Sequence, residues 1–324
     1  MNRINWKKTG LAIAAPVAYA LLLRGLFDLD IVSDFATVMT VTFFASLPFG
    51  VGVLTIAVSD IEKVKSIRYR IFNPWVPILC FFVITLLLAI EGWGCWVMAL
   101  PVFLALSSLG GLTAGYFRLR KWRNANKLNV SLVFLLPLVL GPLEHALPAL
   151  PARYKAYTCI DIRSTREKIW NNVVRVKEIP AASDKGTITR FLRFPRPVKA
   201  ELNYAGVGGS RKAVFTGGLV FDEVVKAYEP GKSMHFSIRA NPHDIPSTTM
   251  DEHVVIGGDY FDVLDGTYQL EQLTDTTYRL HLFSHFELKT DFNFYASWWA
   301  GWIMRDIQDN ILQVIKTRAE DPRE

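Results

Sequence analysis

The chain has 324 residues, 51% of them hydrophobic, and a formal net charge of +6 at pH 7. The positive excess lies in one half, because residues 1–150 hold 13 Lys and Arg against 7 Asp and Glu, whereas residues 151–324 hold 23 of each. This balance in the second half argues against nucleic-acid binding. The three cysteines, Cys80, Cys95 and Cys159, are too few for a disulfide framework or a thiolate metal site, and neither a metal nor a cofactor is predicted.

Apolar segments dominate the first 150 residues. Each is close to the length of about 20 residues that a helix needs to cross a bilayer core. The pattern predicts an all-α transmembrane anchor of about five helices over residues 1–150. The five segments are Leu11–Phe27, Phe35–Val58, Trp75–Ile90, Trp96–Phe117 and Asn129–Leu147.

The loops between these segments alternate in charge. Basic residues cluster at the amino terminus and after the second and fourth segments, whereas Asp28–Asp34 and Glu91–Gly94 contain neither Lys nor Arg. The positive-inside rule therefore predicts a protein of the inner or plasma membrane with a cytoplasmic amino terminus, and five crossings place the carboxy-terminal domain on the extracytoplasmic side. Arg24 departs from this pattern, and we expect it to reach the interface or to pair with Asp28.

Few polar residues lie within the predicted spans. Glu91 and Glu144 fall near segment ends, where water can reach them, which does not favour a transport route. Small residues in the fourth segment predict close helix packing. They are Ser107, Ser108, Gly110, Gly111 and Gly115.

The second half, residues 151–324, has the patterns of an α+β domain. Tyr157–Ile162 alternates like a strand, and Ser164 with Glu167 forms a capping box that starts a short helix containing Trp170. Several strand-like runs follow, with turns at Gly217-Gly218, Pro230-Gly231 and Thr274-Asp275, which indicates an antiparallel meander. The runs are Lys199–Tyr204, Arg211–Thr216, Leu219–Tyr228, Ser233–Ala240, Tyr260–Gln272 and Thr277–Leu288.

The last predicted element is a long amphipathic helix over Phe294–Arg318. Such a helix needs an apolar partner, and an antiparallel sheet with one free face supplies it, so we expect a curved sheet wrapped around this helix with space between them. The apolar side is predicted to contain Phe294, Trp298, Ile303, Ile307, Ile311, Leu312 and Ile315.

Four segments of the second half carry a resemblance to a known family. They are Ile162–Trp170, Gly206–Arg211, Phe221–Val225 and Tyr228–Lys232. Together with the element order, they resemble the helix-grip domains of the SRPBCC superfamily, which includes START lipid-transfer domains, the birch-pollen allergen group and polyketide cyclase/dehydrase-like proteins. The resemblance implies that Ile162–Trp170 forms the strand and the helix that open such a domain, with Trp170 packed beneath the sheet. It also implies a cavity between the sheet and the final helix that accepts a hydrophobic ligand.

Five residues are predicted to bind this ligand or to border the cavity: Arg211, Glu223, Tyr260, Trp298 and Arg305. Two placements of Arg305 are open, since it either projects into solvent or meets Glu223 across the cavity mouth.

The sequence gives less support to catalytic residues than to ligand-binding residues. His253 and Asp262 lie in an acid-rich, glycine-containing stretch, where a carboxylate beside a histidine suits proton transfer, but turn capping explains the same residues. His281 and His285 share one strand face with polar neighbours, so we expect both on the solvated face. The chain contains no Walker loop, no G-x-S-x-G and no dinucleotide fingerprint.

The aromatic residues at the start of the final helix have two interpretations, core filling or contact with the membrane interface. The function that the sequence favours is membrane-anchored binding of a hydrophobic small molecule or lipid, with the lipid bilayer as the second partner. A cyclase- or dehydratase-like enzyme and a structural or signalling module with a filled cavity are the alternatives.

Overall fold

The computed structural model describes residues 6–27, 40–123, 137, 140–144, 146, 150–180, 183–240, 257–258 and 260–322. The chain divides into two compact units, Met1–Ala149 and Leu150–Glu324. The first is helical and the second contains all the described strands, so the mixed α+β architecture predicted from the sequence is confirmed.

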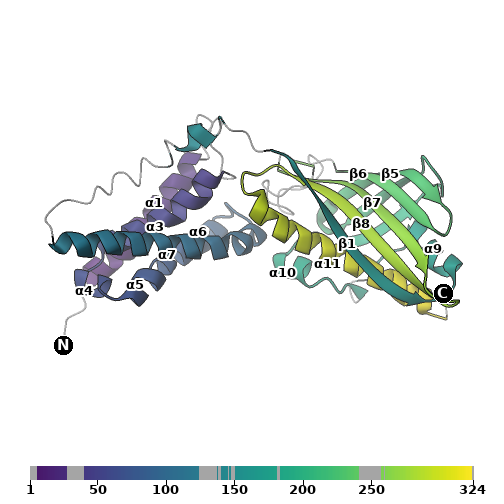
Figure 1. Cartoon of the computed structure of the whole chain (residues 1–324), viewed down its shortest axis with the longest axis horizontal. Helices are drawn as coiled ribbons and strands as arrows, with labels where there is room; N and C mark the ends of the chain where they lie inside the picture. Colours follow the sequence, from purple (N-terminus) through teal and green to yellow (C-terminus); the bar gives the residue numbers. More distant parts are fainter. Residues whose placement is uncertain are drawn as a thin grey trace. The chain divides into compact units, whose positions relative to one another are not determined.

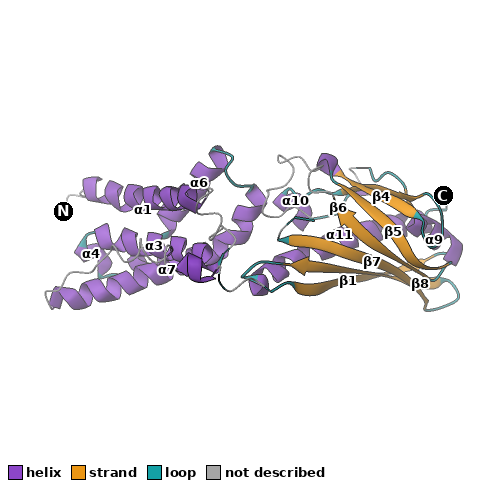
Figure 2. Cartoon of the chain, turned by 90° about the horizontal axis from the view of Figure 1, so that it is seen from above, coloured by secondary structure: helices purple, strands orange, loops and turns teal. Residues whose placement is uncertain are grey.

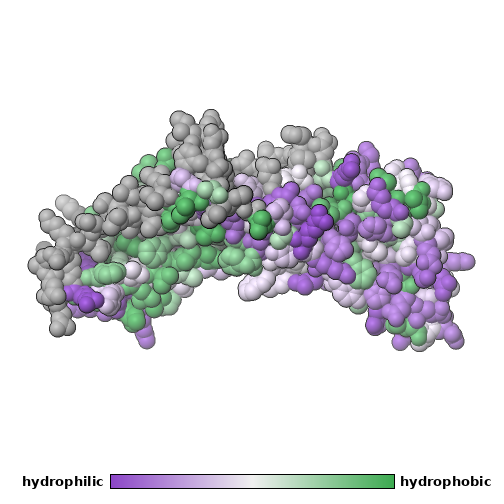
Figure 3. All heavy atoms as spheres, turned by 45° about the horizontal axis from the view of Figure 1, so that its top comes forward, coloured by the Kyte–Doolittle hydropathy of each residue, from purple (hydrophilic) through white to green (hydrophobic). Residues whose placement is uncertain are grey.

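The first unit contains four helical segments that are long and apolar enough to cross a membrane: Gly10–Phe27, Val41–Val58, Ile67–Leu87 and Trp93–Arg120. Figure 3 shows hydrophobic side chains gathered on the surface of these helices. Twelve of the 19 residues of the predicted fifth segment, Asn129–Leu147, lie outside the described residues, so the fifth crossing stays a prediction. The helices are α1 (Trp6–Phe27), α3 (Val41–Val58), α4 (Ile61–Val64), α5 (Ile67–Phe72), α6 (Trp75–Leu87) and α7 (Trp93–Arg123).

Small residues bring α3 and α7 into close contact, which confirms the predicted packing. A Cβ added at Gly110 would overlap the backbone carbonyl of Phe49, and one at Gly52 would overlap the carbonyl of Ser107. Each glycine therefore allows an approach that any larger residue would prevent. Ser108 adds a polar link, because its hydroxyl accepts a 2.8 Å hydrogen bond from the indole N–H of Trp75.

Two carboxylates of the first unit have structural partners. Arg24 is buried within the first unit, and its Nε donates to Oε1 of Glu91 at 2.8 Å. Asp28, the partner expected from the sequence, lies outside the described residues. Glu144 accepts the backbone N–H groups of Val41 and Thr42 at 2.6 and 2.7 Å, so its negative charge lies at the amino-terminal end of α3, where the helix dipole favours it.

The second unit is an eight-stranded antiparallel sheet in the order β1-β8-β7-β6-β5-β4-β3-β2, with α11 along one face (Figures 1 and 2). This meander closed by a long helix is the helix-grip arrangement that the sequence implies. The strands are β1 (Ala152–Arg163), β2 (Arg175–Val176), β3 (Pro197–Leu202), β4 (Ser210–Phe215), β5 (Val220–Glu229), β6 (Ser233–Ala240), β7 (Phe261–Gln272) and β8 (Thr277–Leu288), and the helices are α9 (Arg166–Val174), α10 (Ile188–Leu192) and α11 (Asn293–Glu320).

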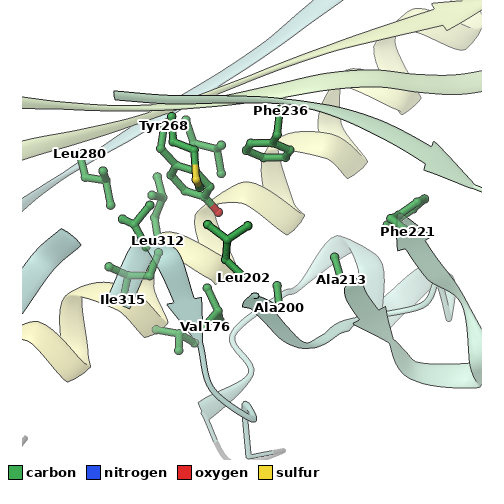
Figure 4. Packing of buried hydrophobic residues seen from close by; sticks show 14 of the residues in the cluster. Val176, Ala200, Leu202, Ala213, Phe221, Phe236, Tyr268, Leu280, Leu312 and Ile315 are labelled. Carbon is green, nitrogen blue, oxygen red and sulfur yellow. The ribbon is translucent and has the colours of Figure 1, made fainter. Parts of the chain in front are cut away.

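The core lies between the curled sheet and α11. Tyr268 and Phe236 reach into it from one wall, and Ala200 and Ala213 face it from the other, with Leu312 of α11 packed in the same cluster (Figure 4). Alternate residues of β8 face this core, as predicted, and every second residue from Tyr278 to Leu288 is buried. This period of two leaves the intervening side chains on the outer face.

The start of α9 differs by one residue from the prediction. Thr165, rather than Ser164, is the N-cap, and its hydroxyl accepts the N–H of Lys168 at 3.3 Å. The hydroxyl of Ser164 instead donates to the carbonyl of Ala319 in α11 at 2.6 Å. The Ser164 side chain therefore binds α11, and Thr165 caps α9. Trp170 packs beneath the sheet, as the resemblance implies, and its indole N–H donates to Tyr228 Oη at 2.9 Å.

The apolar side predicted for the final helix was wrong over its first turns. Phe294 is 75% exposed and Trp298 is 68% exposed. The core-facing positions there are Ala296 and Ala300, and the buried side continues through Met304. Because alanine is small, it allows close packing on the sheet, and the large rings then point away from the core.

Candidate functional site

Arg211 and Glu223, two of the predicted cavity residues, meet inside the core. They are directly opposite each other in the register of β4 and β5, and Arg211 Nε donates to Glu223 Oε2. Their residues are only 5% and 6% exposed. Glu223 therefore pairs with Arg211, and of the two placements left open for Arg305 the structure shows projection into solvent, since Arg305 is exposed.

Aromatic rings cover the Arg211 guanidinium. Its Cζ lies 4.7 Å from the ring centroid of Phe236 and 5.8 Å from that of Tyr268. Burial opposes the charge of Arg211, but the Glu223 carboxylate and the Tyr268 hydroxyl outweigh it and raise the pKa of Arg211. The guanidinium is thus a fixed charge that can orient dipoles but does not exchange protons near neutral pH.

A second polar group links α11 to the inner face of the sheet. Gln308 of α11 donates through Nε2 to Ser284 Oγ at 2.9 Å, and its Oε1 accepts from Thr158 Oγ1 at 3.3 Å. All three residues are buried. Because each polar atom named here has a partner within the protein, this group fixes the helix on the sheet.

Of the two catalytic candidates, the described residues include Asp262 alone. Asp262 is opposite Glu287 in the register of β7 and β8, on the outer face, where burial raises its pKa and the neighbouring Glu287 adds to the effect. Tyr260 is half-buried just before β7, and its carbonyl accepts the N–H of Lys289 at 3.0 Å. His253 lies outside the described residues.

The two strand histidines lie on the outer face of the sheet, as predicted. His281 Nε2 is 3.1 Å from Glu271 Oε2, and His285 Nδ1 is 2.7 Å from Asp265 Oδ1. Within the described residues, no group of three or more His, Cys, Asp or Glu side chains is arranged to hold a metal ion.

An apolar groove lies between α10 and α11. Its volume is about 280 Å³, close to the lower end of the range of small-molecule sites, about 300 Å³. None of the described lining side chains titrates near neutral pH, so these residues offer apolar contact and ring stacking but no acid or base. The lining residues are Thr187, Ile188, Phe191, Leu192, Trp299 and Trp302.

The helix α10 was missed in the sequence, although Ile188, Phe191 and Leu192 have the i, i+3, i+4 spacing of a short amphipathic helix. Five residues are too few to form a stable helix alone. The tertiary structure supplies the stabilisation, because Asp306 of α11 holds the start of α10.

The Asp306 carboxylate accepts four hydrogen bonds from two threonines. Its Oδ1 accepts the N–H and the hydroxyl of Thr187 at 3.0 and 3.1 Å, and its Oδ2 accepts the N–H and the hydroxyl of Thr189 at 2.9 and 2.7 Å. Burial alone would raise the pKa of Asp306, but these donors outweigh it and lower the pKa. The ionised carboxylate therefore fixes one wall of the groove against the other.

A second clamp holds the segment before α10. Asp184 is buried, its Oδ2 pairs with Arg196, and its Oδ1 accepts from Asn310 Nδ2 at 2.9 Å. Asn310 Oδ1 accepts the backbone N–H of Lys185 at 2.8 Å. These partners come from three separate parts of the sequence, so the groove is a tertiary feature that local patterns do not reveal.

Comparisons with known proteins identify no relative by sequence: no family model and no curated protein matches the chain. Solved structures match about half of it. An uncharacterized protein from Bacillus thuringiensis is 12% identical with a TM-score of 0.33, covering 52% of this chain and 100% of that chain. Truncated norcoclaurine synthase from Thalictrum flavum is 10% identical with a TM-score of 0.31, covering 51% and 94%. Ara h 8.0201 is 12% identical with a TM-score of 0.31, covering 51% and 97%.

Proposed function

We propose that this chain is a membrane-anchored protein that binds a hydrophobic small molecule or a lipid in its helix-grip domain. The observation that carries the proposal is the apolar groove between α10 and α11, walled by Trp299 and Trp302 on one side and by Ile188 and Leu192 on the other. Removal of apolar surface from water at such a groove favours binding by about 25 cal/mol per Å².

The composition of the groove supports binding rather than a reaction. Apart from the two indole N–H groups, Thr187 supplies the one polar side chain among the described lining residues, and its hydroxyl and N–H both donate to Asp306. The polar core group of Arg211 and Glu223 is covered by rings of the protein itself. A ligand with an apolar body therefore fits the groove better than the core around this ion pair.

The membrane anchor is the second part of the proposal. Four helices of the first unit have the length and composition of membrane spans. We propose a cytoplasmic amino terminus and an extracytoplasmic helix-grip domain, in line with the charge of the loops and a fifth crossing over residues 129–147.

The full chain reconstituted in lipid nanodiscs tests ligand binding with a photoreactive fatty acid as the probe. Photolabelling followed by peptide mass spectrometry is expected to place the probe on α10 and α11, at Ile188, Leu192 or Trp299. An excess of unmodified fatty acid is expected to remove the label, because both molecules compete for the same groove.

Ile188→Glu is expected to abolish this labelling, because it places a charge in the apolar wall. Val214→Glu is the matched control, since Val214 is also a half-buried aliphatic residue but lies on β4, outside the groove. Labelling that is not competed, or equal labelling of both variants, would contradict ligand binding in the groove. It would favour the alternative of a structural or signalling module.

A further inference from the structure

Four aromatic side chains of the second unit form an exposed set, which we call the aromatic face: Phe191, Phe294, Trp298 and Trp302. Their exposed fractions are 61%, 75%, 68% and 48%. Phe294, Trp298 and Trp302 follow each other at intervals of four along α11, and Phe191 of α10 lines the same groove as Trp302. They are therefore neighbours on one surface. A single exposed apolar side chain is ordinary, but such a cluster marks an interaction surface.

The aromatic face begins where the chain enters the second unit. Asn293, the first residue of α11, donates through Nδ2 to the carbonyl of Leu150 at 3.2 Å and to that of Leu288 at 3.2 Å. Leu150, the first residue of this unit, is 82% exposed. The residue that follows the apolar first unit in the chain is thus fixed beside Phe294.

Arginine side chains lie close in sequence to these rings. Arg190 and Arg193 flank Phe191 in the sequence, and Arg305 lies three residues after Trp302; all three arginines are exposed. Arginine at the rim of an apolar surface can pair with lipid phosphates while the rings enter the less polar layer beneath.

We propose that the aromatic face docks on the interfacial layer of an anionic lipid bilayer. Indole rings favour this layer because they have an apolar body and one N–H donor, and phenyl rings favour its acyl boundary. We favour a bilayer as the partner because the apolar helices precede Leu150 in the chain, and Leu150 lies beside this surface. Docking would place the groove opening at the lipid, so that an acyl chain could enter without crossing water.

The docking proposal rests on the membrane anchor of the proposed function but not on ligand binding. The test uses the full-length chain without its native cysteines, which are replaced by Cys80→Ala, Cys95→Ala and Cys159→Ser. A single nitroxide label is then attached at Phe294→Cys or at Trp298→Cys. Both positions are largely exposed and neither lines the groove, so the substitutions leave the core and the groove intact.

Asp275→Cys, in the exposed β7–β8 turn, is the matched control. This turn lies at the other end of α11, because Thr277 is opposite Arg163 in the register and the Arg163 N–H donates to Glu320. The helix of 28 residues separates the two ends by about 40 Å.

The labelled protein is placed in vesicles of phosphatidylcholine and phosphatidylglycerol. We then measure how often each nitroxide collides with oxygen, which concentrates in bilayers, and with a nickel chelate, which stays in water. We expect the oxygen-to-nickel ratio at positions 294 and 298 to be several-fold higher than at 275. Equal ratios at all three positions would overturn the proposal, and so would low rates with both reagents at 294 and 298, which would indicate cover by protein. Photolabelling of the groove reports ligand binding separately, so the two proposals can fail independently.

Discussion

Arg211 and Glu223 form a buried ion pair across β4 and β5, with side chains 4% and 7% exposed. Removing two charges from water is costly, and their attraction offsets the cost only while both are present. The register of the two strands places them opposite each other, so the sheet topology determines the pair.

We expect Arg211→Met to lower the free energy of unfolding of the second unit by about 3–5 kcal/mol, because it leaves the Glu223 charge buried without its partner. Hydrogen exchange of the β4 and β5 amides, in the full chain in detergent, measures the change. The double variant Arg211→Met with Glu223→Leu is expected to recover most of the loss. Arg279→Met is the control, since its ion pair with Asp161 is exposed, and we expect little change. Equal effects of the two single variants would contradict the role of burial.

We expect a similar loss of stability when the buried Arg24–Glu91 pair of the first unit is broken. The two side chains are 5% and 9% exposed, and their Nε and Oε1 atoms are 2.8 Å apart. Arg24→Leu leaves the Glu91 charge buried, so we expect a loss of about 3–5 kcal/mol and a lower midpoint of thermal unfolding in detergent. Arg120→Leu, at an exposed position of α7, is expected to leave the midpoint almost unchanged. A midpoint unaffected by Arg24→Leu would show that this pair is not stabilising.

Gly110→Ala tests the contact between α3 and α7. The added methyl group would overlap the Phe49 carbonyl, so the helices must separate, and we expect a loss of about 1–3 kcal/mol. Gly25→Ala in α1 is the matched control, because a Cβ there has no atom within 4 Å. Alanine favours helix by about 1 kcal/mol over glycine, so Gly25→Ala is expected to be neutral or stabilising. Thermal midpoints in detergent that move in the same direction for both would contradict the packing.

Acid is expected to release α10 from α11. The pKa of Asp306 is lowered in the folded protein relative to about 3.9 in an unfolded chain, so its contribution to stability is complete above that value and is lost as the pH falls through the folded pKa. Hydrogen exchange of the Thr187 and Thr189 amides, corrected for the intrinsic rate, is expected to rise below pH of about 4. Asp306→Asn is expected to remove this dependence, and protection that persists in acid would contradict the role of the carboxylate.

The exposed Cys159 provides a test of topology. In a background with Cys80→Ala and Cys95→Ala, an extracytoplasmic helix-grip domain predicts that a membrane-impermeant maleimide labels Cys159 in intact spheroplasts. Labelling only after lysis would place the domain in the cytoplasm and exclude five crossings with a cytoplasmic amino terminus. A Cys159→Ser variant controls for background labelling.

Several features of the fold were predictable because they are local. The period of two in β8 identified the core side from Tyr278 to Leu288, and Pro230-Gly231 marked a hairpin at which Gly231 has a φ of 70°. The burial of Trp170 followed from the resemblance of Ile162–Trp170 to a strand and helix that open the helix-grip domains. In the site, Arg211 and Glu223 were expected to border the cavity, but their pairing with each other was not predicted.

Features that depend on distant contacts could not be predicted. The partner of Arg24 lies 67 residues away in the sequence. The groove requires α10, a helix too short to form alone, and the Asp306 carboxylate that holds it. Trp298 points away from the core because other residues of α11 pack on the sheet. The spacing of the large apolar residues had favoured Phe294 and Trp298 over Ala296 and Ala300.

The amino-acid sequence by itself determined the apolar helical half, the antiparallel meander and the long final helix, because hydrophobic length and periodicity act within a single segment. Only the tertiary structure decided which charges are paired, which side of α11 is covered, and that α10 and α11 enclose an apolar groove. Those outcomes depend on the desolvation and packing of side chains that come together only when the chain has folded.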